Sequence, residues 1–172
     1  MRTEGKDGLA DCLSSVFSDG NDIRPLGDLR SLKLFGKLLK LPERIEELPS
    51  LVKLTLQCTG LQRDAVEVLG ALTNLTSLRL CKESFMGNGL HFRKKTFTSL
   101  AVLELCGLVN VKSVTFEESA TPQLKLLKVE CWWDWDAGCC SFTGLKHLTN
   151  LMEVHVQGLD CGDWEETCRN LV

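Results

Sequence analysis

Residues 51–56 read LVKLTL, and the leucines Leu51, Leu54 and Leu56 define a pattern that recurs along the chain. The same spacing, with valine replacing leucine at some positions, begins at Leu29, Leu51, Leu75, Leu100, Leu124 and Leu151. The successive starts are separated by 22, 24, 25, 24 and 27 residues. Such regular spacing is not expected by chance, so the chain is predicted to consist of stacked structural repeats.

Within each pattern the final Leu-x-Leu step places both apolar side chains on one face of a short strand. The remaining residues cross the opposite side of the repeat and return to begin the next strand in parallel. One repeat is too small to bury its apolar face, so neighbouring repeats stack and share a core. This spacing is typical of the leucine-rich repeat, whose period is about 20–29 residues.

The predicted fold is therefore α/β: a right-handed leucine-rich-repeat solenoid. Its short parallel β-strands form the concave face, and irregular loops and short helices form the convex face. We expect a single domain over residues 1–172 with about six repeats. Apolar spacing predicts the helix of a partial preceding repeat within 6–20 and a capping segment over 160–172.

The segments between strands are predicted to differ from one another. Pro42 and Pro49 leave room for about one helical turn between them. Apolar residues at helical spacing predict a helix over 64–72, with Asp64 as its N-cap. Residues 81–97 and 131–143 are less periodic and are predicted to be long loops.

The slot where many leucine-rich repeats keep an asparagine ladder contains other residues in this chain. They are Lys37, Thr59, Glu83, Leu108, Trp132 and Leu159. Without that ladder, the turns are not expected to share one hydrogen-bonding scheme, which favours an irregular solenoid.

Composition excludes several classes of protein. The 20 Lys+Arg and 23 Asp+Glu residues give a net charge of −3, which argues against a strongly basic nucleic-acid-binding protein. No run of about 18 apolar residues is present, so membrane insertion is not expected. The charged N-terminal stretch lacks the apolar core of a secretory signal. These features favour a cytoplasmic location.

The nine cysteines fit free thiols better than a secreted disulfide framework, because their number is odd. Four of them, Cys58, Cys81, Cys106 and Cys131, recur at intervals of 23, 25 and 25 residues. Such periodicity indicates a structural slot in each repeat, and buried thiols in a reducing compartment are expected.

Strand alternation predicts which side chains point outward from the concave face. The middle position of each strand gives the row Lys33, Thr55, Arg79, Glu104, Lys128 and His155. The next outward position includes Cys81 and Cys106. The row mixes charge signs and sizes, as a protein-binding surface does, so its six residues are the predicted partner-binding site. A solvated face on which Arg79, Glu104 and Lys128 neutralise one another is the alternative.

Two other groups of residues are candidate sites. Trp133 and Trp135 are candidate aromatic anchors for a partner, or they pack within a convex loop. The basic stretch from His91 to Lys95 could contact an acidic partner, although a solvated loop is the simpler interpretation. The cysteines and histidines lack metal-ligand spacing, and no catalytic motif frames the serines, so neither a metal, a cofactor nor an enzymatic activity is expected.

Several phrases resemble one particular family. They are LPERIEELPSLVKLTL (41–56), ALTNLTSLRL (71–80), FTSLAVLELCGLVNVKSVTFEESATPQLKLLKVE (97–130) and GLKHLTNLMEVHV (144–156). Together they are similar to the C-terminal repeat domain of plant nucleotide-binding leucine-rich-repeat disease resistance proteins, especially those of cereals. The resemblance implies an intracellular recognition domain that senses a pathogen effector or a guarded host protein, or that restrains the receptor's own nucleotide-binding domain.

The chain departs from complete members of that family because no G-x-x-x-x-G-K-[ST] phosphate loop is present. It is therefore expected to be a fragment or a truncated paralogue that does not itself hydrolyse nucleotide. The alternative functions are a leucine-rich-repeat substrate adaptor of a ubiquitin ligase and a gene fragment without function.

Overall fold

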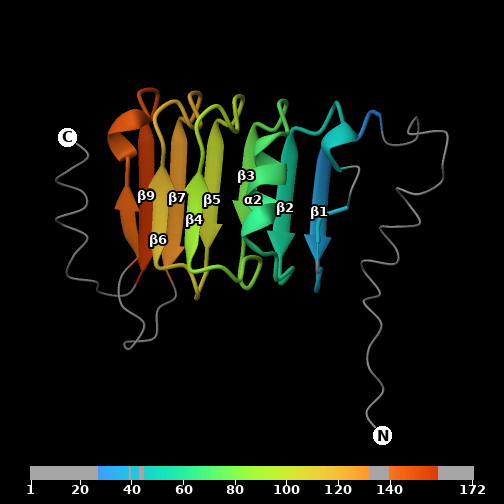
Figure 1. Cartoon of the computed structure of the whole chain (residues 1–172), viewed down its shortest axis with the longest axis horizontal. Coiled ribbons are helices and arrows are strands. Elements are labelled where there is room, and N and C mark those ends of the chain that lie inside the picture. The colour runs from blue at the N-terminus through green and yellow to red at the C-terminus, as the bar shows by residue number, and fades with distance from the viewer. Residues whose placement is uncertain (1–26, 39, 43–44, 132–139, 159–172) are drawn as a thin grey trace, which may run out of the picture.

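A computed structural model describes residues 27–38, 40–42, 45–131 and 140–158, whose strands form two parallel sheets (Figure 1). The larger sheet has six strands in the order β1-β2-β3-β5-β7-β9. They are β1 (Ser31–Phe35), β2 (Lys53–Gln57), β3 (Ser77–Leu80), β5 (Val102–Cys106), β7 (Leu126–Cys131) and β9 (Glu153–Gly158). Each coincides with one of the repeated leucine patterns, so the predicted solenoid is confirmed.

The opposite side of the molecule carries a second parallel sheet and short helices. The second sheet has the order β4-β6-β8, formed by β4 (Gly89–Phe92), β6 (Ser113–Phe116) and β8 (Ser141–Thr143). The helices are the 3-10 turn η2 (Ile45–Glu47), the helix α2 (Arg63–Gly70) and the 3-10 turn η3 (Leu145–His147). We call the six-stranded face concave and this one convex.

The second sheet corrects the expectation that residues 81–97 and 131–143 are long irregular loops. They contain β4 and β8, and β6 lies between them in the sheet. The physical reason is an alternation like that of the concave strands. In β4, Leu90 and Phe92 are buried, whereas Gly89 and His91 point away from the core.

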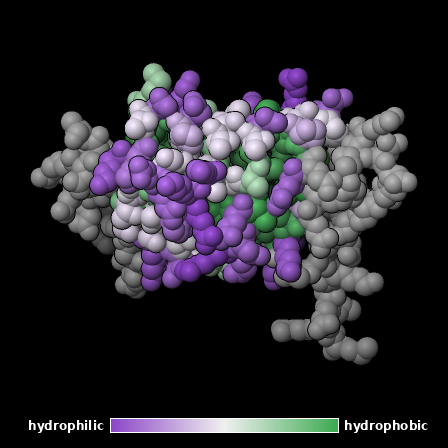
Figure 2. Space-filling model, turned by 45° about the horizontal axis from the view of Figure 1, so that its top comes forward, coloured by the Kyte–Doolittle hydropathy of each residue, from purple (hydrophilic) through white to green (hydrophobic). Residues whose placement is uncertain are grey.

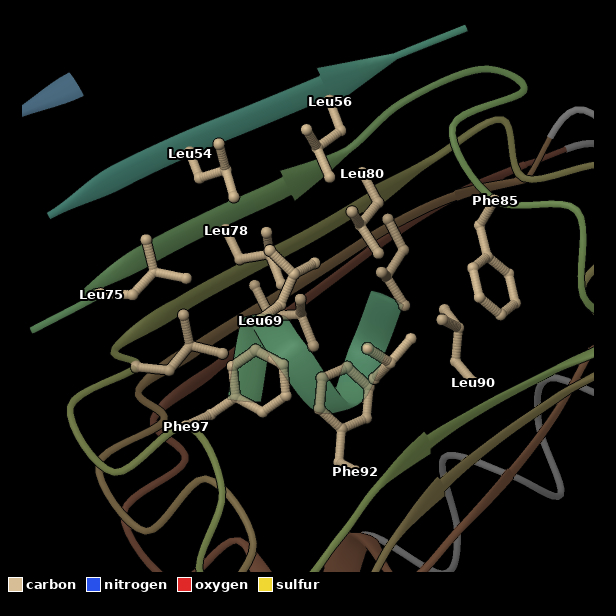
Figure 3. Packing of buried hydrophobic residues seen from close by; sticks show 14 of the residues in the cluster. Leu54, Leu56, Leu69, Leu75, Leu78, Leu80, Phe85, Leu90, Phe92 and Phe97 are labelled. Atoms are coloured by element: carbon tan, nitrogen blue, oxygen red, sulfur yellow. The ribbon is translucent and has the colours of Figure 1, made fainter. Parts of the chain in front are cut away.

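The core lies between the two sides and contains leucines from the concave strands together with phenylalanines from the convex segments (Figure 3). Leu56 and Leu75 are fully buried, and α2 contributes Leu69. Phe92 stacks on Phe116 with ring centroids 4.8 Å apart. Because the aromatic rings come from successive repeats, they tie the convex strands to one another as well as to the concave sheet.

The helical predictions are partly confirmed. The turn between Pro42 and Pro49 is present as η2, whose Ile45 is fully buried. The predicted helix over 64–72 is α2, but Asp64 lies in its first turn and the N-cap residue is Gln62, which makes no side-chain capping bond. Asp64 is a favourable capping residue type, but burial of Ala65 and Val66 sets where the helix begins.

One backbone arrangement recurs at each junction between neighbouring concave strands. A single carbonyl at the start of one strand accepts two backbone N–H groups from the next repeat, at 2.9–3.0 Å. The accepting residues are Arg30, Val52, Thr76, Ala101 and Lys125. This shared backbone scheme lies at the start of the strands, whereas the asparagine-ladder slot lies beyond their other end, so it does not test the prediction made for that slot.

The residues of the ladder slot behave differently from one repeat to the next. Thr59 is buried and its hydroxyl donates to the Ser84 carbonyl at 2.9 Å, whereas Leu108 packs into the core. Trp132 and Leu159 lie outside the described residues, as do the predicted helix at 6–20, the predicted cap at 160–172 and the aromatic anchors Trp133 and Trp135. The opposite edge of the concave sheet is thus irregular, as predicted.

Asparagine does connect repeats, but at a position other than the predicted ladder slot. The side-chain amide of Asn74 donates to the Pro49 carbonyl at 2.6 Å, and that of Asn150 donates to the Pro122 carbonyl at 2.7 Å. Each asparagine immediately precedes the first leucine of its pattern. It therefore ties the start of one strand to the preceding repeat.

Replacing Asn74 with alanine should lower the free energy of unfolding by about 1 kcal/mol, because the Pro49 carbonyl loses its donor. Gln123 occupies the corresponding slot before Leu124, is exposed and makes no side-chain hydrogen bond with the described residues, so Gln123→Ala is the matched control. Urea denaturation of both variants provides the measurement. Equal losses in the two variants would contradict this role for Asn74.

Gly144 should not tolerate alanine. Its φ is +78°, and a Cβ would overlap the carbonyl oxygen of Phe116. Gly60 also has a positive φ of +64°, but a Cβ there would meet only Met86 Cγ at 3.8 Å. Both alanine variants pay the strain of the left-handed backbone, about 1–2 kcal/mol. Gly144→Ala should therefore unfold at clearly lower urea concentration than Gly60→Ala, and equal midpoints would contradict the overlap.

Candidate functional site

The six residues predicted to form the partner-binding row lie side by side across the concave sheet. The register pairs Lys33 with Thr55, Thr55 with Arg79 and Arg79 with Glu104. It continues from Glu104 to Lys128 and from Lys128 to His155. The burial pattern places them outward, since they are exposed or half-buried while the flanking leucines Leu54, Leu56, Leu78 and Leu80 are buried.

The charged residues of this row form short-range ion pairs. Arg79 Nε lies 3.4 Å from Glu104 Oε2, on the neighbouring strand, and Lys128 Nζ lies 2.7 Å from Glu130 Oε1. The expected triplet of Arg79, Glu104 and Lys128 is therefore only partly formed. Residues two apart in a strand share a face, so Glu130 reaches Lys128 within β7.

These pairs contribute little to stability, because the Arg79 side chain is 46% exposed and solvent screens its charge. His155 has a similar neighbour on its own strand, with its Nε2 3.2 Å from Glu153 Oε2. The acids Glu130 and Glu153 were not singled out from the sequence. The spacing of two residues from Lys128 and His155 is the signal that would have found them.

The charges on the concave face change sign along the solenoid. Strands β1 to β3 contribute the outward cations Lys33, Lys53 and Arg79. Strands β5, β7 and β9 contribute the outward acids Glu104, Glu130 and Glu153, together with Lys128 and His155. The half of the face formed by β1 to β3 is therefore cationic, whereas the half formed by β5, β7 and β9 carries charges of both signs.

Two of the outward cysteines are buried although they belong to the concave face. Cys81 is 8% exposed and Cys106 is 6% exposed, which confirms the expectation of buried thiols for these two residues, whereas Cys58 is half-buried. Arg79 and Glu130 lie close enough to Cys106 for their side chains to interact with its thiol. Strand alternation predicts which face of the sheet a side chain is on, but not how much of that side chain is exposed to solvent.

The four periodic cysteines do not share one slot. Leu56 pairs with Leu80, which places Cys58 one residue beyond the position of Cys81. Cys106 pairs with Glu130, so Cys131 also lies one residue beyond the position that corresponds to Cys106. The nearly equal spacing of the cysteines in the sequence concealed this difference, because the repeats differ in length.

The environment of the two thiols keeps them protonated. Burial, followed by the nearby Glu130 carboxylate, raises the pKa of Cys106 to about 11. Burial also raises the pKa of Cys81. The hydrogen bond from Lys128 lowers the pKa of Glu130, so this carboxylate stays ionised beside the neutral thiol. The thiols are therefore packing and hydrogen-bonding groups rather than nucleophiles.

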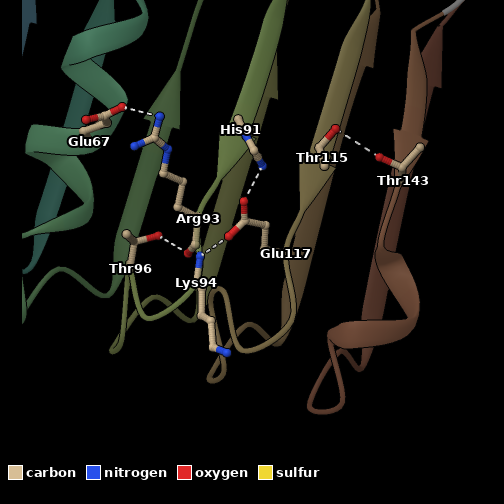
Figure 4. A network of polar contacts seen from close by, with 8 residues as sticks. All are labelled: Glu67, His91, Arg93, Lys94, Thr96, Thr115, Glu117 and Thr143. Carbon is tan, nitrogen blue, oxygen red and sulfur yellow. Dashed lines mark hydrogen bonds and ion pairs between the residues drawn. The ribbon is translucent and has the colours of Figure 1, made fainter.

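The basic stretch from His91 to Lys95 is a solvated loop only in its second part, because Arg93, Lys94 and Lys95 are exposed and follow β4. His91 and Phe92 belong to β4, and Phe92 is fully buried. His91 Nε2 lies 2.9 Å from Glu117 Oε1, and Arg93 Nη2 lies 2.8 Å from Glu67 Oε1 (Figure 4). Two of its basic side chains are thus paired with acids on the convex face.

Among the described residues, no group of three or more histidine, cysteine, aspartate or glutamate side chains is arranged to hold a metal ion.

The helices in the described ranges are all too short or too polar to cross a bilayer.

Comparison with known proteins assigns the class of this fold. A family model described as a leucine-rich repeat region matches residues 9–170, and the chain belongs to this family. The chain is 28% identical over 142 residues to the disease resistance protein RPP8 of Arabidopsis thaliana. It is 28% identical over 138 residues to the disease resistance protein RPH8A, and 25% identical over 141 residues to the disease susceptibility protein LOV1, both of the same plant.

These matches cover 80% of this chain but only 14–15% of each relative. The chain therefore corresponds to the leucine-rich-repeat part of much longer plant disease resistance proteins.

Iodoacetamide should modify Cys58 much faster than Cys106 in the folded protein at pH 8. Cys58 is half-buried, whereas Cys106 is covered and its pKa of about 11 leaves little thiolate. Peptide mass spectrometry gives the rate at each cysteine, and we expect a difference of at least about tenfold. Raising the pH toward 11 should narrow that difference. Equal rates at pH 8 would contradict the protected thiol.

Proposed function

We propose that this chain is the non-catalytic recognition domain of an intracellular plant immune receptor, located in the cytoplasm, and that it binds a protein partner through its concave face. The observation that carries the proposal is similarity over 80% of the chain to plant disease resistance proteins. The outward row from Lys33 to His155 supports the choice of surface.

The partner in this proposal is a pathogen effector, a host protein that the receptor guards, or the receptor's own nucleotide-binding domain. The charge pattern of the concave face favours a folded protein with both acidic and basic patches over a nucleic acid. Lys33 and Lys53 face one end of such a partner, and Glu104 and Glu153 face the other. Complementarity of this kind selects the partner and sets its orientation.

A partner changes signalling only if its affinity for the repeat domain differs between the inhibited and the active states of the receptor. A partner that binds the repeat domain equally well in the inhibited and active states of a receptor shifts neither state. The domain therefore acts as a switch element if the partner and the nucleotide-binding domain compete for the same row of residues.

The first step of the test identifies a partner by crosslinking from the concave face. A photo-crosslinking amino acid is placed at Thr55, in the middle of the row, and at Lys146 of η3 as the control position. Both forms are expressed in leaf cells challenged with a pathogen. The proposal expects a protein crosslinked from position 55 and not from position 146.

The crosslinked protein is then purified and its affinity measured against a charge swap. The double variant Arg79→Glu with Glu104→Arg keeps both the net charge and an ion pair, so the fold should survive. Binding should weaken at least about tenfold, because like charges would face each other in the complex. Lys146→Glu should leave binding unchanged. A partner that binds the swapped form as tightly as the natural chain would place the site elsewhere.

A further inference from the structure

A hollow of about 250 Å³ lies on the convex side, where α2 stands beside β4 and β6. Hydrophilic side chains gather over this part of the surface (Figure 2). Its polar lining groups are Arg63, Glu67, His91, Arg93, Ser113 and Thr115. None of them belongs to the concave row, and the hollow is on the other face of the solenoid.

The hollow results from a change of secondary structure between repeats. A helix with its side chains is about 10–12 Å thick, whereas a strand is much thinner, so α2 rises above the neighbouring sheet. The floor beside it is formed by Gly89 of β4 and Ser113 of β6, which the register pairs. A Cβ at position 89 would lie 2.9 Å from Ser113 Oγ, so glycine keeps the floor low.

The two arginines on the rim have unused hydrogen-bonding capacity. Arg93 Nη2 contacts Glu67 Oε1 at 2.8 Å, and Arg63 Nη2 donates to the side-chain oxygen of Asn88. Their remaining guanidinium nitrogens have no partner among the described residues. Because a guanidinium carries five N–H donors and no acceptor, the rim presents mainly donors to a ligand.

The floor adds hydroxyl groups that are also available. Thr143 donates its hydroxyl hydrogen to Thr115 Oγ1 at 3.0 Å, which leaves the Thr115 hydrogen free for a ligand (Figure 4). Ser113 Oγ has no partner among the described residues. His91, at the edge, is held by Glu117. Glu67 is the single carboxylate among the lining residues, so cationic and donor groups outnumber it.

We propose that this hollow binds a small molecule that carries a phosphate group and hydroxyl groups. The phosphate lies between Arg63 and Arg93, whose fork of N–H donors matches its oxygens. The ligand hydroxyls contact Ser113 and Thr115. The volume is slightly below the 300–1,000 Å³ of drug-sized sites, which fits a small phosphomonoester. The site is independent of partner recognition by the concave face.

The test is a titration of the full 172-residue chain followed by two-dimensional amide NMR. The probes are sn-glycerol 3-phosphate, inorganic phosphate and glycerol, each at the same ionic strength set by sodium chloride. We expect saturable shifts at Gly89, Ser113 and Thr115 with the phosphate ester at millimolar concentration. Inorganic phosphate should bind more weakly, because it lacks the hydroxyl contacts, and glycerol should produce no shift.

Variants on the two sides of one ion pair should act in opposite directions. Arg93→Gln and Arg63→Gln should each weaken binding about tenfold, because each removes charge-assisted hydrogen bonds. Glu67→Gln should strengthen binding several-fold, because it releases Arg93 and removes the opposing charge. Lys125→Gln removes one exposed cation away from the hollow and should leave binding unchanged.

Several outcomes would overturn the proposal. The hollow is not a phosphate site if the ester gives no saturable shift or binds Arg63→Gln and Arg93→Gln as tightly as the natural chain. If an arginine variant fails to fold, Glu67→Gln decides, since unchanged or weaker binding by that variant contradicts the proposal. Equal affinity for inorganic phosphate and the ester would overturn the hydroxyl contacts.

Discussion

The structure depends on a single backbone arrangement, in which one carbonyl at the start of each concave strand accepts two N–H groups from the next repeat. This arrangement recurs from Arg30 to Lys125, although the side chains and the lengths of the repeats differ. It fixes the register of every strand pair. Because side chains alternate with a period of two, a slip by one residue would exchange the buried leucines for the charged row.

With the register fixed, each repeat can vary on its other side. One repeat crosses the convex side with a 3-10 turn, the next with α2, and the following ones with β4, β6 and β8. The phenylalanines of these strands fill the space that helices fill elsewhere. The height difference between α2 and β4 forms the convex hollow, so a change in crossing segment produces a local surface shape that no single repeat has.

Much of this architecture could be predicted from the sequence, because the leucine spacing reports both strand position and inward direction. The row from Lys33 to His155 follows directly from it. Burial of Cys81 and Cys106 agrees with the expectation of buried thiols. The ion pairs could not be predicted in full, since alternation gives the face of a side chain and not which neighbour it contacts, and Lys128 pairs with Glu130 rather than with Glu104. The convex sheet was missed because residues 89–92, 113–116 and 141–143 lack leucine regularity, although their alternation was visible. The prediction that the periodic cysteines share one structural slot was wrong, because repeats of unequal length shift their position by one residue.

The second sheet also determines how strongly the solenoid bends. Strands in a sheet lie about 4.7–4.9 Å apart, whereas packed helices need about 8–10 Å. A solenoid with helices on its outer side must curve, because each repeat occupies more length on that side than on the strand side. When both sides consist of strands, each repeat occupies the same length on both. From β3 onward, β4, β6 and β8 form the outer side of the solenoid. We therefore expect the two sides to advance by similar distances per repeat. We therefore expect the surface around Glu104 and Lys128 to be flatter than that of a repeat stack backed by helices, which suits a broad protein face better than a protruding loop.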